Sequence, residues 1–116
     1  MEHASFVSTA TVKGALVARI ECNSVGQRES AILQEALVEA AENGHWRLAV
    51  DMTNVTILTS VGIGMLITLH KKCHEHKGKF VIFGISPEIV DLLRLTRLDK
   101  LLKIAKDRDA AVKAVA

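Results

Sequence analysis

The sequence predicts an α/β fold in which helices are layered on a largely parallel β-sheet. Short apolar runs alternate along the chain with segments whose apolar residues recur at helical spacing. Hydrophobic residues make up 49% of the 116 residues and aromatic residues only 3%, so the core must be aliphatic. A chain of this length can bury a core of its own but is too short for two, so we expect a single domain over residues 1–116.

The first half of the chain is expected to form a hairpin, a helix and a strand. Residues 5–12 and 15–22 read as two β-strands on either side of the turn Lys13–Gly14. A helix follows, with Ser30 as its expected cap and Asn43–Gly44 as its end. Its apolar face contains Ile32, Leu33, Ala36, Leu37, Ala40 and Ala41. The run WRLAVDM then predicts a short strand that opens at Trp46 and ends at Asp51.

The second half repeats the alternation. A helix is expected to begin near Ser60 and to continue to His76, followed by a buried strand over KFVIFGI, residues 79–85. Ser86 is the expected cap of the next helix, with Pro87 at its first position. A short strand over residues 102–104 and a small helix opened by Asp107 complete the prediction.

The segment ILTSVGIGMLITLHKK, residues 57–72, is the candidate functional site. It leaves a strand and starts a helix, and ligand sites of parallel sheets gather beyond the carboxyl ends of strands. The residues alone leave two interpretations of Ser60 open: it caps the helix, or it carries a phosphate that the helix N-terminus stabilises. Gly62 and Gly64 would let the backbone of another molecule approach the first turn closely.

Between Trp46 and Ala105, about half of the chain, the sequence resembles the STAS domain of anti-sigma factor antagonists. The runs SVGIGML, HKGKFVIFGISPEI and LTRLDKLLKI match the family pattern in order and in spacing, while the first half of the chain agrees only in layout. The resemblance implies an open mixed β-sheet of four to five strands with interspersed helices packed on it.

The resemblance also implies a regulatory binding protein rather than an enzyme, cytoplasmic and without a cofactor. By motif position Ser60 is the phosphoacceptor, modified by a kinase-type anti-sigma factor and restored by a serine phosphatase. Binding of the anti-sigma factor would release a sigma factor and so regulate transcription, and phosphorylation would switch binding off. The expected partner-binding residues are Asp51, Thr59, Ser60, Val61, Gly62, Ile63 and Gly64.

Two residues depart from the family pattern. Thr59 stands where most members have Asp, which removes a carboxylate beside Ser60, and Arg97 stands where the family has Gly, so that turn is expected to avoid positive φ. Two other functions remain open beside the anti-sigma factor antagonist. One is a STAS subunit of a membrane transporter or ATPase complex without a phosphorylation cycle, and the other is a small enzyme that uses the Ser60 loop.

Further features set the limits of the prediction. The net charge is +2 and the basic residues are scattered, so no nucleic-acid footprint is expected. Residues 52–69 carry no formal charge, but polar residues and glycines interrupt them and no membrane insertion is expected.

His70 and His74 have metal-ligand spacing beside Cys73, yet no second cluster completes a site, and a buried, unbridged thiol is the simpler expectation. Asp51 reads equally well as a turn-maker or as partner surface, and Trp46 as packing.

Overall fold

Five strands form the main sheet, in the spatial order β1-β2-β4-β6-β7. They are β1 (Val7–Val12), β2 (Ala15–Ile20), β4 (Arg47–Asp51), β6 (Lys79–Phe83) and β7 (Lys103–Ile104). β1 pairs antiparallel with β2 through the predicted turn at Lys13–Gly14, and every other pair in this sheet is parallel. The computed structural model describes residues 7–115, apart from the side chains at positions 27 and 28. The first two residues of the strand predicted over 5–12 lie outside this range.

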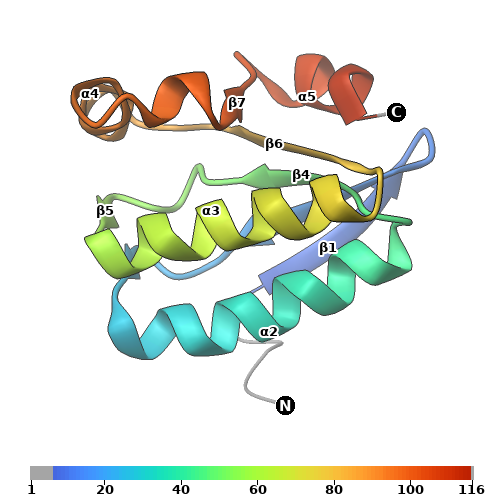
Figure 1. Cartoon of the computed structure of the whole chain (residues 1–116), viewed down its shortest axis with the longest axis horizontal. Coiled ribbons are helices and arrows are strands. Elements are labelled where there is room, and N and C mark those ends of the chain that lie inside the picture. Colours follow the sequence, from blue (N-terminus) through green and yellow to red (C-terminus); the bar gives the residue numbers. More distant parts are fainter. Residues whose placement is uncertain (1–6, 116) are drawn as a thin grey trace.

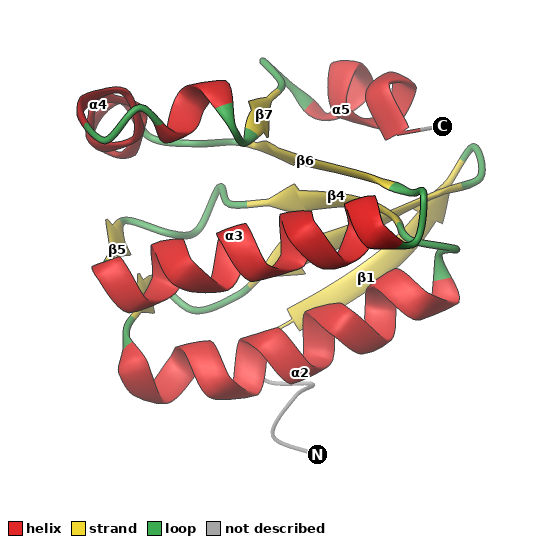
Figure 2. Ribbon diagram, viewed as in Figure 1, coloured by secondary structure: helices red, strands yellow, loops and turns green. Residues whose placement is uncertain are grey.

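Four α-helices cover the two faces of the sheet (Figures 1 and 2). They are α2 (Gln27–Asn43), α3 (Ser60–Glu75), α4 (Pro87–Leu95) and α5 (Arg108–Val115), with a short 3₁₀ helix η1 (Leu98–Lys100) after α4. The larger core cluster includes buried residues of α2, α3 and α4, whereas α5 packs on the opposite face against residues such as Val17 and Val81. β4 and β6 lie between the two layers, which explains why both are near-continuous apolar runs. The predicted α/β fold with a mixed five-stranded sheet is confirmed.

A second, very small sheet was not predicted. β3 (Ser24–Val25) and β5 (Ile57–Leu58) pair in parallel, and each has only two residues. They join the segment that enters α2 to the segment that enters α3, so the two helices start side by side. Two-residue strands are too short to show a hydrophobic period, which is why the sequence gives no sign of them.

The start of α2 differs from its prediction. The helix begins at Gln27, and Gly26 is its N-cap, so the prediction that Ser30 caps it is wrong. Glu29 makes this start possible because its carboxylate accepts a 3.1 Å hydrogen bond from the amide of Gly26. Ser30 lies buried within the helix, and its hydroxyl has no hydrogen-bond partner among the described residues.

The turn after α4 also differs. Arg97 has φ of 61°, in the left-handed region, so the prediction that this turn avoids positive φ is wrong. Helix α4 has to end before η1 begins, and a left-handed residue is a common way to stop a helix. Leu93 before the turn and Leu102 after it are both buried, and their packing holds the chain in this path although Arg97 has a side chain.

Two of the predicted ends are confirmed by their hydrogen bonds. Ser86 caps α4 and accepts a bond of 3.3 Å from the amide of Ile89, and Asp107 accepts one of 2.9 Å from Ala110 at the start of α5. The strand expected to open at Trp46 begins one residue later, because Trp46 itself has φ of 63°. None of the helices within residues 7–115 has the length and apolar character needed to cross a membrane.

Candidate functional site

Asp51, at the carboxyl end of β4, is a buried anchor for the loop that leads to the site. One carboxylate oxygen accepts hydrogen bonds from the amide and the hydroxyl of Thr53, and the other accepts a 3.1 Å bond from Nε of Arg19. Burial raises the pKa of Asp51, but these hydrogen bonds and the guanidinium charge more than offset it, so the pKa lies below its ordinary value. Of the two interpretations left open by the sequence, these contacts support the turn-maker.

Thr59 is the N-cap of α3. Its hydroxyl oxygen accepts a 3.3 Å hydrogen bond from the amide of Gly62, which satisfies one of the free donors of the first turn. The same hydroxyl donates a 2.8 Å bond to the carbonyl oxygen of Val25 in β3, and the amide of Thr59 bonds that oxygen as well. Thr59 therefore fixes the start of α3 to the neighbouring segment.

Ser60 follows the cap as the first residue of the helix, so the interpretation of Ser60 as the cap is wrong. Its side chain is exposed, and its hydroxyl has no hydrogen-bond partner among the described residues. The backbone amides of Ser60 and Val61 are also without a partner within residues 7–115. Because the N-terminus of a helix favours negative charge, this serine is placed where an added phosphate would be stabilised.

The two glycines of the segment have different roles. A Cβ on Gly62 would lie 2.7 Å from the side chain of Leu58 and 2.9 Å from both the side chain and the carbonyl oxygen of Val25. Gly62 is therefore needed for packing inside the molecule, and the sequence-based idea that it opens room for a partner is wrong. A Cβ on Gly64 would meet nothing within 4 Å, so Gly64 does leave open surface.

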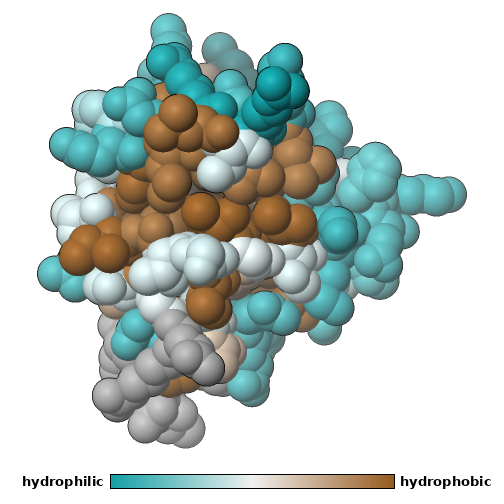
Figure 3. Space-filling model, turned by 60° about the vertical axis from the view of Figure 1, so that its left-hand side comes forward, coloured by the Kyte–Doolittle hydropathy of each residue, from teal (hydrophilic) through white to brown (hydrophobic). Residues whose placement is uncertain are grey.

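Two exposed apolar side chains lie close to Ser60 in the sequence. Ile57 in β5 is 57% exposed and Val61 is 44% exposed, and together with Ser60 and Gly64 they form what we call the Ser60 surface. Figure 3, which turns the side with β5 and the start of α3 toward the reader, shows apolar residues gathered in a broad band. Leu95, at the end of α4, is 83% exposed. Such exposed apolar groups are typical of a protein-binding face.

Neither Ile57 nor Leu95 was singled out from the sequence. Leu95 could have been suspected, because it lies two residues beyond the buried Leu93 and so falls off the apolar stripe of its helix. Of the seven predicted partner-binding residues, Ser60, Val61 and Gly64 are exposed, Thr59 and Ile63 are half-buried, and Asp51 and Gly62 are buried.

The family model for the STAS domain matches residues 6–111. The chain belongs to the STAS domain family. Among solved structures, this STAS domain resembles an anti-sigma factor antagonist from Mycobacterium paratuberculosis with a TM-score of 0.82, at 22% sequence identity and over 94% of this chain and 92% of that one. This likeness confirms the fold.

Curated relatives of this STAS domain include two anti-sigma-B factor antagonists. The one from Listeria monocytogenes is 28% identical over 57 residues, which are 49% of this chain and 50% of the relative. The one from Staphylococcus epidermidis is 28% identical over 72 residues, which are 62% of this chain and 67% of the relative. The chain thus spans about half of the length of the Listeria protein that it matches.

The histidines near the end of α3 do not form a metal centre with the thiol beside them. The rings of His70 and His74 are stacked with centroids 6.2 Å apart, but Cys73 is 1% exposed and faces the core. Burial raises the pKa of Cys73 to about 11, so it stays a thiol, and the prediction of a small buried hydrophobe is confirmed. Within the described chain, no three His, Cys, Asp or Glu side chains are placed to hold a metal ion.

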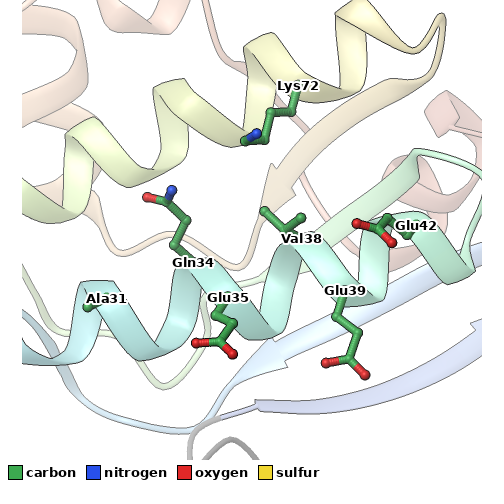
Figure 4. A pocket seen from close by; sticks show the side chains of 7 residues that line it. All are labelled: Ala31, Gln34, Glu35, Val38, Glu39, Glu42 and Lys72. Atoms are coloured by element: carbon green, nitrogen blue, oxygen red, sulfur yellow. The ribbon is translucent and has the colours of Figure 1, made fainter.

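One hollow of this STAS domain lies away from Ser60. It is an open groove of about 720 Å³ between α2 and α3. Figure 4 shows that six of its seven lining side chains come from α2 and that Lys72 comes from α3. Three of the α2 side chains are Glu35, Glu39 and Glu42, so the groove is acidic. No serine or cysteine is among the described residues that line it.

Proposed function

We propose that this STAS domain is an anti-sigma factor antagonist. It binds a kinase-type anti-sigma factor through the Ser60 surface and so releases a sigma factor, which makes it a cytoplasmic regulator of transcription rather than an enzyme. The bound kinase phosphorylates Ser60 and thereby ends the complex, and a serine phosphatase restores binding. Family membership and the curated relatives support the antagonist role, while the kinase and the phosphorylation cycle rest on the arrangement around Ser60.

The proposal rests mainly on the different roles of Thr59 and Ser60 at the start of α3. Thr59 supplies the cap, so the hydroxyl of Ser60 is exposed and makes no bond within the described chain that phosphorylation would break. A phosphate there would be close to the free amides of Ser60 and Val61. The fold should therefore tolerate the modified and the unmodified serine equally well.

The same phosphate should be incompatible with the complex. It adds about −1.5 to −2 charges at pH 7. Ile57 and Val61, the exposed side chains nearest in sequence, are apolar and offer it no counter-charge. Burying an unpaired charge against a partner costs several kcal/mol, and each ~1.4 kcal/mol is a tenfold loss of affinity. A switch of this kind needs no change of conformation.

The test uses two substitutions and titration calorimetry against the anti-sigma factor kinases of the source genome. Ser60→Asp should melt near the wild-type temperature and lose at least about a hundredfold in affinity. Ser60→Ala should bind like the wild type, and after incubation with kinase and ATP its peptide around residue 60 should carry no phosphate in mass spectrometry. Thr11→Asp adds the same charge on the exposed edge strand β1 and should bind normally.

The opposite results would end the proposal. Equal affinity of wild type and Ser60→Asp would show that charge at residue 60 does not control binding. Binding to a membrane ATPase subunit, with no phosphate found on Ser60, would favour the transporter-subunit function instead.

A further inference from the structure

A second hollow lies at the far end of α3 from Ser60. Its volume is about 320 Å³, within the range of small-ligand sites. It is lined by His70, His74, Gly78, Lys79, Phe80, Val81, Lys103 and Ala114. Figure 1 shows the setting: the last turns of α3 and the helix α5 lie on opposite sides of the start of β6. Three parts of the chain that are distant in sequence, residues 70–81, Lys103 and Ala114, thus contribute to one hollow.

The formal charges in the lining of this hollow are all positive and come from Lys79 and Lys103. His70 and His74 come from α3, Lys79 from β6 and Lys103 from β7, while α5 contributes the uncharged Ala114. No acidic side chain is among the described residues that line it, in contrast to the acidic groove between α2 and α3. Phe80 and Val81 offer little apolar surface to a ligand, because they are only 5% and 1% exposed and their side chains pack into the cores on opposite faces of the sheet. Lysine and imidazole donors suit an anionic group.

His70 has an unusual environment. Its Nδ1 atom is buried and has no hydrogen-bond partner among the described residues. Burial and the neighbouring His74 hold the pKa of His70 below its ordinary value, and the ring is neutral at pH 7. A neutral His70 still donates one hydrogen bond, and a bound anion would favour its protonation.

From this arrangement we infer that the hollow between α3, β6 and α5 binds a small organic anion. The ligand has a carboxylate or phosphate group held by Lys79, Lys103 and the two histidines. This site does not depend on the function proposed for Ser60. The distance along α3 from Ser60 to His70 is about 15 Å, so the ligand would not overlap the Ser60 surface.

Three probes separate the contributions of charge and apolar contact. Benzoate and phenyl phosphate carry an anion on an aromatic ring, and benzyl alcohol carries the same ring without charge. Amide chemical shifts in NMR titrations should move at Gly78, Lys79, Val81 and Lys103 with both anions and should stay unchanged with benzyl alcohol. The tighter of the two anions identifies the natural head group. No shift with either anion, or equal binding of benzyl alcohol, would refute the site.

A matched pair of lysine variants tests the location. Lys103→Gln removes a lining charge and should weaken benzoate binding about tenfold, since hydrogen bonds to charged groups are the strong ones. Lys106→Gln removes the same charge from an exposed residue outside the lining and should change the affinity less than twofold, by the usual scale of screened surface charges. Both lysines are exposed, so both variants should fold. Equal losses in the two variants would mean that benzoate senses only the net charge of the protein.

Discussion

The hydroxyl of Thr59 donates a 2.8 Å hydrogen bond to the carbonyl oxygen of Val25 while it accepts one from the amide of Gly62. One side chain thus caps α3 and ties it to the segment that enters α2. An aspartate, the residue that the resemblance to anti-sigma factor antagonists led us to expect here, can accept the cap bond but cannot donate to a carbonyl. The departure from the family pattern therefore replaces a carboxylate next to Ser60 with a structural bridge.

Substitutions of Thr59 should separate the contributions of its two hydrogen bonds to stability. Thr59→Ser keeps both and should be near wild type, whereas Thr59→Ala loses both and should lower the free energy of unfolding by about 1–2 kcal/mol. Thr59→Asp keeps the cap and adds a favourable charge at the helix start, but it places a carboxylate against the carbonyl of Val25. We expect it to fall between the other two in urea denaturation. A Thr59→Asp variant more stable than wild type would show that the hydrogen bond to Val25 does not contribute to the free energy of unfolding.

The glycines provide a matched pair for stability. Gly62→Ala should destabilise the domain by about 1–3 kcal/mol, because the new methyl group would overlap Leu58 and the backbone of Val25. Gly64→Ala meets open space and should stabilise the helix by up to about 1 kcal/mol through its better helix propensity. Denaturant midpoints of the two variants should shift in opposite directions. Shifts of the same sign would mean that the packing around Gly62 adapts without cost.

Replacing Arg97 with glycine should stabilise the domain. At φ of 61° a side chain is strained by about 1–2 kcal/mol, while glycine loses some of this advantage through the entropy of the unfolded chain. We therefore expect Arg97→Gly to raise the melting temperature slightly. Arg94→Gly, in the regular part of α4, is the control and should lower the free energy of unfolding by about 1 kcal/mol. A loss of stability in Arg97→Gly as large as in the control would show that the Arg97 side chain has a contact of its own.

Asp51 should control stability in acid. Its folded-state pKa is below the ordinary carboxyl value of 3.8, so its ionised form stabilises the fold. This contribution is complete above the unfolded-state pKa and is lost as the pH falls through the lower, folded-state pKa. Asp51→Asn should be less stable by about 1–3 kcal/mol at pH 7 and should lose less on acidification. Urea melts at pH 7 and near pH 3 measure both effects, and Asp91→Asn, on the exposed side of α4, should follow the wild type.

Features with local chemistry were predictable from the sequence. The start of α4 was found because Ser86 and Pro87 favour it whatever the rest of the chain does, and β4 and β6 were found because both their faces are buried. The predictions that failed depended on distant contacts. Gly62 is required by Val25, which lies in another segment, and the turn at Arg97 is held by leucines on both sides of it.

In the candidate site, too, local features were predictable from the sequence and features set by distant contacts were not. The position of Ser60 at the helix start followed from its place between a strand and a helix, but the exchange of roles with Thr59 did not. A serine and a threonine are both good caps, and only the register of the helix decides between them. That register is set by β3 and β5, whose two-residue pairing leaves no pattern in the sequence.

The indole of Trp46 and the imidazole of His76 are stacked with ring centroids 4.0 Å apart and nearly parallel planes. Trp46 is the single tryptophan of the chain, so all indole emission comes from this one joint between α3 and the start of β4. The joint is about 24 Å along α3 from Ser60. The fluorescence of Trp46 therefore reports on the end of α3 that is remote from the Ser60 surface. A partner that binds the Ser60 surface and leaves the emission unchanged has not altered the stacking of Trp46 on His76, and one that binds there and alters the emission has changed this packing at the far end of α3.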